Sequence, residues 1–374
     1  MRRLLAVAWK ELVQLRRDRL TFGMMVGVPL MQLMLFGYAI NTDVRHMPTL
    51  VFDQDHSAES RDLVTRLENT GFYDVTGYVQ DYAAITKAMR GGLAKVAVVV
   101  PPEFGKSLRE GRAARAQLVV DGSDPQTVAS ATNTATALAA ARSIELTTER
   151  MQLSGRTGPS ESISIEPTTW YNPELKTAIF VVPGLVGVIL TMTMIMFTSM
   201  AIVRERERGT LEQLIVSPVG RFELVIGKIL PYIAIGYVQM SIILLAGKLI
   251  FHVPIRGELG LLYTLASVFI AACLALGLFF STIAKTQQQA MQMSFFFLLP
   301  NILLSGFMFP YEGMPRAAQV LAEVLPLTHF LRIVRGITLK AATFPDVRGE
   351  LGSLAIILAA LVILSSLRFS KKLG

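Results

Sequence analysis

Long runs of apolar residues alternate with shorter polar segments along this chain of 374 residues. About 20 apolar residues in a helix cross the hydrocarbon core of a bilayer, so runs of this length predict transmembrane spans. The pattern predicts six spans, near residues 21–40, 177–203, 229–251, 259–284, 289–309 and 351–367. The expected fold class is therefore a polytopic α-helical membrane protein, and a hydrophobic content of 52% supports it.

The first 20 residues combine positive charge with an amphipathic pattern. Six of them are Lys or Arg, and apolar residues repeat at helical spacing at Leu4, Leu5, Ala8, Leu12 and Leu15. The pattern predicts that residues 1–20 form an interfacial helix on the cytoplasmic surface of the membrane. A secretory signal peptide is the alternative, but the apolar run that follows is too long for one and has no clear cleavage site.

Residues 41–176 contain no run that could span a membrane. They hold 14 Lys or Arg against 17 Asp or Glu, and short strand and helix patterns alternate along them. This alternation predicts an α/β domain inserted between the first and second spans. We expect strands at 49–53, 73–79, 94–100 and 116–121, helices at 58–69, 81–90, 102–110 and 125–153, and a polar linker at 155–164.

Four acidic residues stand at the ends of the predicted strands, at Asp53, Asp55, Asp121 and Asp124. Paired carboxylates at such positions occur in metal and catalytic sites. Their spacing is too short for a calcium-binding EF-hand loop. Turn and helix-cap hydrogen bonding is therefore the preferred interpretation.

A densely charged segment, residues 204–218, lies between two of the most apolar runs. Thr210 to Gln213 fits a capping box, Gly209 interrupts the chain before it, and Pro218 ends it. These signals predict a short helix at 211–216 that lies across the membrane face. It is either an ordinary positively charged inside loop or a docking helix for a cytoplasmic partner.

Lys and Arg are concentrated beside the spans on one side of the membrane, at 204–228, at Lys285 and in the tail 368–374. The positive-inside rule then places both termini in the cytoplasm and residues 41–176 outside. It also explains the net charge of +8 without a nucleic-acid partner. Residues 310–350 lie outside in this topology, where Pro326 interrupts an apolar pattern, so we expect a broken amphipathic hairpin in the outer leaflet.

Polar residues within spans are costly in a bilayer and are therefore candidates for a substrate pathway. Gln239 and Ser241 lie in the third predicted span, and Asn301 and Ser305 lie in the fifth. Asn301 follows Pro300, so it could instead bind a carbonyl that the proline leaves free. Both interpretations of Asn301 stay open.

The sequence has no motif for nucleotide hydrolysis and no metal-ligand spacing of His or Cys. A Gly-x-x-x-x-Gly-Lys-[Ser/Thr] loop is absent, because Gly227-Lys228 has the wrong spacing and is followed by Ile229. The single cysteine, Cys273, lies in an apolar run and is expected to serve packing. We therefore expect no catalytic residue, metal or cofactor on this chain.

Five segments carry more specific motifs: WYNPEL at 170–175, VPGL at 182–185, IVRERERGTLEQL at 202–214, GKILPY at 227–232 and PLTHFLRIVRGI at 326–337. Together they resemble the ABC transporter type-two permeases. The most similar branch is bacterial, multidrug-efflux-like, and has a large extracytoplasmic domain. DQDHS at 53–57 and DGSDP at 121–125 also match this branch. The resemblance covers nearly the whole chain, although His329 stands where an aromatic residue is more common.

The resemblance implies a permease subunit that exports an amphiphilic substrate across the bacterial inner membrane and pairs with a second copy or a sister permease. It implies a cytoplasmic ATP-binding subunit that carries the ATP and magnesium, and it leaves a periplasmic adaptor open. The residues that would form the docking site, or coupling helix, are Arg204, Glu205, Arg206, Glu207, Arg208, Gly209, Thr210, Leu211, Glu212, Gln213 and Leu214.

Two other classes of protein compete with an ATP-driven exporter. An ion-coupled secondary transporter would need ionisable residues in mid-span, whereas Lys248 and Lys285 lie near span ends and no Asp or Glu lies centrally. A membrane-anchored scaffold for a periplasmic partner would not need the polar, proline-broken fifth span.

Overall fold

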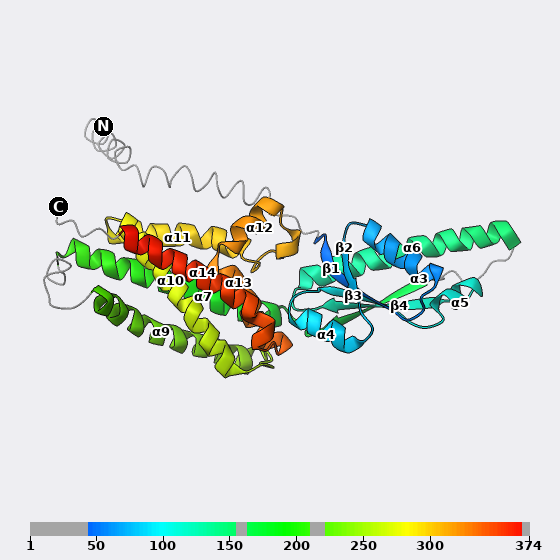
Figure 1. The fold of residues 1–374 in the computed structure, drawn as a ribbon, viewed down its shortest axis with the longest axis horizontal. Coiled ribbons are helices and arrows are strands. Elements are labelled where there is room, and N and C mark those ends of the chain that lie inside the picture. The colour runs from blue at the N-terminus through cyan, green and yellow to red at the C-terminus, as the bar shows by residue number, and fades with distance from the viewer. Residues whose placement is uncertain (1–43, 155–162, 210–220, 369–374) are drawn as a thin grey trace, which may run out of the picture.

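The structure is a computed structural model that describes residues 44–154, 163–209 and 221–368. Within these ranges the molecule is elongated, with a bundle of helices at one end and a β-sheet with its helices at the other (Figure 1). We call residues 44–154 and 163–176 the sheet domain and the later residues the bundle. The predicted interfacial helix, first span and tail lie outside the described residues, apart from Arg368.

The sheet domain is built on five strands with the order β2-β1-β3-β4-β5. The strands are β1 Met47–Asp53, β2 Tyr73–Tyr78, β3 Val96–Val100, β4 Ala114–Asp121 and β5 Ile163–Trp170. β1 runs parallel to β2 and β3, β4 runs antiparallel to β3, and β5 runs parallel to β4. The carboxyl ends of β1, β2 and β3 therefore lie at one end of the domain, and those of β4 and β5 at the other.

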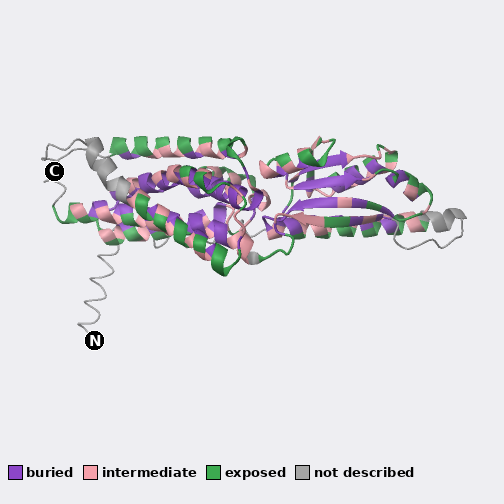
Figure 2. Ribbon diagram, turned by 90° about the horizontal axis from the view of Figure 1, so that it is seen from below, coloured by how far each residue is buried: buried purple, intermediate pink, exposed green. Residues whose placement is uncertain are grey.

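Helices cover both faces of this sheet. The helices α3 (Ala58–Asn69), α5 (Phe104–Arg109) and α6 (Pro125–Ser154) pack on one face, and α4 (Tyr82–Arg90) packs on the other. Both faces are covered because side chains alternate along the strands. In β3, Val96, Val98 and Val100 point to the core on the first face, while Ala97 and Val99 point to the core on the second. Figure 2 shows the resulting buried strands between outer helices that are exposed on one side. The predicted α/β domain is confirmed.

β5 is the one strand of this sheet that the sequence did not predict. Its first residues were assigned to a polar linker, and only Ile163 and Ile165 are buried along it. It is an edge strand held by backbone pairing with β4, and an edge strand tolerates Pro167. An edge strand of this kind lacks the alternating apolar pattern on which the prediction depended.

The bundle contains five long helices and a bent outer segment. The long helices are α7 Thr177–Glu207, α9 Arg221–Ile250, α10 Leu259–Ile283, α11 Gln287–Leu304 and α14 Phe344–Arg368. The outer segment contains η1 Tyr311–Gly313, α12 Arg316–Glu323 and α13 Pro326–Lys340. α7 and α10 form its centre, where a side chain at Gly277 would lie 2.7 Å from the carbonyl oxygen of Ile195. The missing side chain thus allows the two helices to approach closely.

Among the described residues, four helices are long and apolar enough to cross a membrane, namely α7, the later part of α9, α10 and α14. They coincide with four of the predicted spans. α12 and α13 form a fifth candidate only if the pair, which is bent by 83°, counts as one span. The predicted break at Pro326 is confirmed, since α13 begins there.

Two helices of the bundle differ in extent from the predicted spans. The fifth span was predicted at 289–309, but α11 ends at Leu304, and its glutamine-rich start keeps it out of the group of four. The last helix was predicted to begin at 351, but α14 begins at Phe344, so residues 344–350 do not belong to the hairpin. Apolar run length does not mark helix ends here, because α14 opens with polar residues and the apolar run of α11 continues past its end to Phe309.

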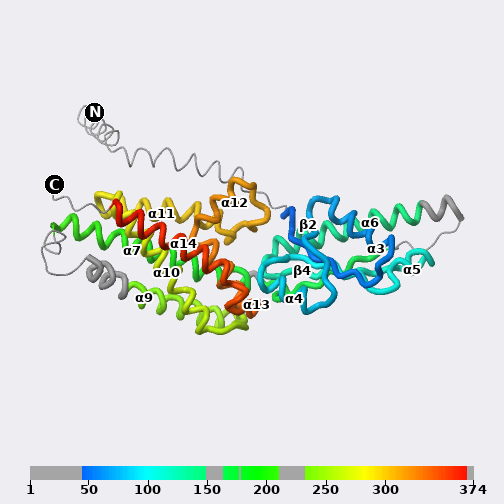
Figure 3. Tube along the Cα trace, in the orientation of Figure 1, coloured from blue at the N-terminus to red at the C-terminus, as the bar shows by residue number. Residues whose placement is uncertain are grey.

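The direction of α7 relates the two ends of the molecule. α7 begins beside the sheet domain and runs to the opposite end of the bundle (Figure 3). The charged residues that follow Val203 therefore lie at the end of the bundle away from the sheet domain.

Candidate functional site

The charged end of α7 is a regular helix terminus. The helix ends at Glu207, and Gly209 has a φ of +69°, a left-handed conformation that glycine adopts without strain. The backbone amides of Arg208 and Gly209 donate to the carbonyls of Arg204 and Arg206, each at 3.1 Å. The predicted interruption at Gly209 is confirmed. Thr210 to Leu214 and the helix predicted at 211–216 lie outside the described residues.

This end of α7 is bound to the turn between α10 and α11. One carboxylate oxygen of Glu207 accepts the backbone N–H of Gln287 at 3.0 Å, and the other accepts its side-chain amide at 2.5 Å. Arg206 donates to the carbonyl oxygen of Ala284 at 3.1 Å. A displacement of the end of α7 would therefore act on the start of α11 as well. Sequence spacing gave no sign of this contact, because it joins residues about 80 positions apart.

The four candidate pathway residues do not form one cluster. Gln239 on α9 accepts a hydrogen bond from Thr193 of α7 at 2.9 Å, and Ser241 lies 2.6 Å from the hydroxyl of Tyr263 on α10. Asn301 and Ser305 lie on α11 and at its end. Among the described residues no hydrogen bond joins the α9 pair to the α11 pair.

Asn301 differs from the other three because its amide is fully buried and neither amide atom has a partner. A buried polar group without a hydrogen bond costs about 1–3 kcal/mol. The interpretation that its side chain binds a carbonyl left free by Pro300 is therefore wrong for this structure. Its role in a substrate pathway remains a prediction.

Buried charges join the sheet domain to the bundle. The ammonium group of Lys340, at the end of α13, contacts the carboxylate of Asp121 at the end of β4 and lies 3.3 Å from the carbonyl oxygen of Met89. Lys95 lies 3.9 Å from the same carboxylate and 3.5 Å from that of Glu312. The side chain of Asp121 is 0% exposed. This junction joins the residue before β3, the end of β4, η1 and the end of α13.

Burial and charge act against each other on the carboxylates of this junction. Burial raises the pKa of Asp121, but the ammonium groups of Lys340 and Lys95 outweigh it and hold the pKa below its usual value. Asp124, only three residues later, has a raised pKa because burial dominates there. Asp121 is therefore present as a carboxylate in the folded protein.

The turn-and-cap interpretation of the four strand-end acids holds for three of them. Asp53 accepts the backbone amides of Asp55 and His56, Asp55 accepts that of Gly105, and Asp124 accepts that of Gln126. Asp121 also accepts a turn amide, but its main contact is the ion pair with Lys340, which the sequence did not predict. Within the described part of the chain no group of acids or histidines could hold a metal ion.

A second polar group links α12, α13 and α14. The buried ring of His329 lies 2.6 Å from a carboxylate oxygen of Glu350 and 2.9 Å from the carbonyl oxygen of Glu323. Arg332 binds both carboxylates and lies over the ring of Tyr311. His329 on α13 therefore joins α12 and α14 at the bend between the helices.

The guanidinium group of Arg335, one turn after Arg332, makes fewer hydrogen bonds than that of Arg332. It donates to the carbonyl oxygen of Gly306 at 2.9 Å and lies over the ring of Phe180, but its Nε and Nη2 atoms are buried without a partner. Sequence reasoning missed this residue, although a cation within an apolar segment was a signal.

The profile of the ABC-2 family transporter protein matches residues 19–367. The chain belongs to this family of ABC transporter permeases. It is 31% identical to the probable multidrug ABC transporter permease YbhR of Escherichia coli over 96% of this chain and 95% of that protein. It is 30% identical to the probable multidrug permease YbhS of the same organism over 90% of this chain and 89% of that protein.

A solved domain of a type-2 ABC transporter from Thermotoga maritima is a weaker match. It covers 33% of this chain and 85% of that domain, at 19% identity and a TM-score of 0.26. The family itself consists of transporter permeases, which are not enzymes and which work with a separate ATP-binding subunit. The predicted family is thus confirmed over nearly the whole chain.

Proposed function

We propose that this permease is the transmembrane subunit of an ATP-driven exporter, located in the bacterial inner membrane with both termini in the cytoplasm. It moves an amphiphilic substrate, drug-like or lipid-like, outward with energy from a separate ATPase. Family membership supports this proposal, as do the names of two relatives that are about 30% identical over most of their length. The family favours this function over an ion-coupled transporter or a scaffold.

The ATPase docks on the segment Arg204 to Leu214 in this proposal. The observation that supports it is the contact of Glu207 with Gln287, because it links the segment to two helices at once. ATP binding closes the ATPase subunits and displaces the segment, and α7 and α11 follow. Such a shift requires that ATP favours one arrangement of the permease over the other.

The sheet domain lies outside the cell membrane, since it is at the opposite end of the bundle from the charged end of α7 (Figure 1). The permease pairs with a second copy or a sister permease, and a periplasmic adaptor would meet it through the sheet domain. Gln239, Ser241, Asn301 and Ser305 line the substrate pathway. This chain itself binds no cofactor.

The test is co-purification of the permease with its tagged cognate ATPase. Leu211→Ala and Glu207→Ala are expected to reduce both the recovered ATPase and ATP-driven transport in vesicles, whereas Glu68→Gln, at an exposed site on α3, should leave both unchanged. Unaltered ATPase recovery and transport in both docking variants would exclude this segment as the docking site.

A further inference from the structure

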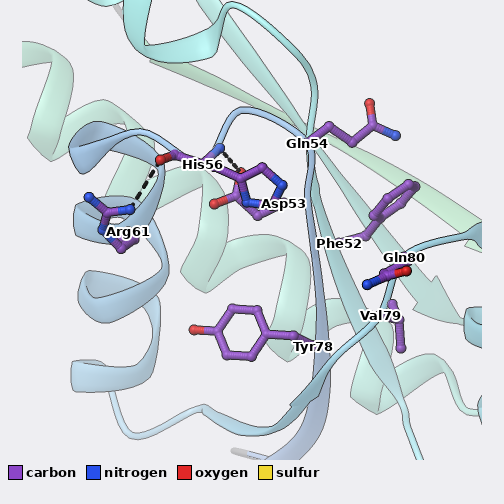
Figure 4. A pocket seen from close by; sticks show the side chains of 8 residues that line it. All are labelled: Phe52, Asp53, Gln54, His56, Arg61, Tyr78, Val79 and Gln80. Carbon is purple, nitrogen blue, oxygen red and sulfur yellow. Dashed lines mark hydrogen bonds between the residues drawn. The ribbon is translucent and has the colours of Figure 1, made fainter.

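The sheet domain has a hollow at the carboxyl ends of β1 and β2. Its volume is about 650 Å³, and its lining includes Phe52, Gln54, His56, Arg61, Tyr78 and Gln80. Figure 4 shows Arg61 on α3, Tyr78 at the end of β2, and His56 in the loop between β1 and α3. Pockets for drug-sized molecules typically measure about 300–1,000 Å³, so the size fits a small molecule rather than a polymer.

The hollow lies at the ends of two adjacent parallel strands. β1 and β2 pair in parallel, and the lining comes from residues at and just after their carboxyl ends and from α3. In open α/β sheets, ligands bind outside the carboxyl ends of the strands. Because β1 runs antiparallel to β4, whose carboxyl end meets the bundle at Lys340, this hollow faces away from the bundle.

The loop that forms the hollow has a fixed shape. Asp53 accepts the backbone amides of Asp55 and His56, each at 3.0 Å, and the hydroxyl of Ser60 at 2.7 Å. His56 has a φ of +52°, an unusual conformation for a residue with a side chain. Non-glycine residues in this region cluster at binding sites, where the surrounding structure maintains the strain. The carboxylate of Asp53 is therefore committed to the loop.

Other groups of the hollow are free to bind a ligand. Arg61 uses one N–H for the carbonyl oxygen of His56, at 3.1 Å, and no carboxylate of the described residues lies within 4 Å of it. The side chains of Gln54 and Gln80 make no hydrogen bond within the described part of the chain. Tyr78 is 69% exposed, which is high for a large aromatic side chain at the edge of a hollow. A guanidinium group and an exposed ring together suit an acidic aromatic molecule.

We infer that this hollow is a binding site for a small anionic aromatic molecule, such as an aromatic sulfonate or carboxylate. The acidic group binds Arg61, and the ring packs on Tyr78. The ligand arrives from the compartment that the far end of the sheet domain faces. The site does not depend on the docking of an ATPase.

The test uses the full chain in phosphatidylcholine nanodiscs and isothermal titration calorimetry. Naphthalene-2-sulfonate is the probe. 2-Naphthylmethylammonium has the same ring with a positive charge and tests the need for an acidic group, and inorganic sulfate tests whether the acidic group binds without a ring. Empty nanodiscs provide the blank. The wild type is expected to bind one naphthalene-2-sulfonate per chain, at least tenfold tighter than the cation. Binding of sulfate alone at equal affinity would overturn the requirement for a ring.

Variants locate the site. Arg61→Gln and Tyr78→Ala should each weaken binding of naphthalene-2-sulfonate at least tenfold, and Arg61→Lys should keep part of it. Arg115→Gln and Leu93→Ala change exposed residues outside the hollow and should bind like the wild type. Equal affinity for the two naphthalene probes, heats equal to those of empty nanodiscs, or unchanged binding in both hollow variants would overturn the proposal. Because no ATPase is present, these results do not depend on the proposed export function.

Discussion

Asp121 is a buried carboxylate whose partners come from distant parts of the chain. Its contact with Lys340 joins residues 219 positions apart, and Lys95 adds a second positive charge. Removing one partner of a buried ion pair leaves the other charge buried without compensation, which costs about 3–5 kcal/mol. The junction between the sheet domain and the bundle is therefore sensitive to single changes at this residue.

Asp121→Asn should lower the melting temperature of the purified permease in neutral buffer, because the buried ammonium group of Lys340 loses the carboxylate that offsets its burial. Asp121→Asn combined with Lys340→Met removes both charges and is expected to recover part of the loss. Thermal unfolding followed by intrinsic fluorescence measures both effects. Additive losses in the double variant would show that the two side chains do not interact.

The same pair predicts a dependence of stability on pH. The ammonium groups hold the pKa of Asp121 below its usual value, so the pair stabilises the fold above the unfolded pKa of about 3.9. The stabilisation is lost as the pH falls through the lowered folded pKa. The difference in melting temperature between wild type and Asp121→Asn should therefore shrink below about pH 4, and a constant difference would contradict this account.

Asn301 is also buried, but unlike the carboxylate of Asp121 its side-chain amide has no hydrogen-bond partner. Asn301→Leu replaces it with an apolar side chain of similar size and should raise the free energy of unfolding by about 1–3 kcal/mol. If the residue lines the pathway, transport falls in the same variant. Asn133→Leu, at an exposed position on α6, is the control. A lower melting temperature for Asn301→Leu would show that the amide has a structural role.

At the scale of elements, the connection between α7 and α11 is the contact that matters most for the proposed function. Gln287→Ala removes a side-chain hydrogen bond to Glu207 but leaves the docking segment intact. We expect normal recovery of the ATPase but less substrate moved per ATP hydrolysed. Gln288→Ala, at the exposed neighbouring residue, should retain the wild-type ratio. Equal ratios in the two variants would show that force does not pass through this contact.

At the scale of the whole molecule, the sheet domain and the charged end of α7 lie at opposite ends (Figure 1). Single cysteines test whether a membrane separates them, on a background in which the buried Cys273 is replaced by Ala. Leu93→Cys should react with a membrane-impermeant maleimide in spheroplasts, and Gln288→Cys only after permeabilisation. The reverse pattern would place the docking segment outside the cytoplasm and contradict the proposed function.

The sequence by itself determined the features that are periodic or continuous along the chain. The length of the apolar runs marked α7, α9, α10 and α14, and alternating patterns marked β1 to β4 and the helices between them. Both signals are local, because a span or a two-sided strand must place apolar residues at fixed spacing. The motif at residues 202–214 added the family.

Only the tertiary structure decided which distant residues meet. The pairing of β5 with β4, the ion pair of Lys340 with Asp121 and the contact of Glu207 with Gln287 each join separate segments. Backbone pairing at a sheet edge requires no particular side chains, and a single charged pair leaves no pattern at either position. The free energy of such contacts depends on burial, and burial is set only when the segments have packed together.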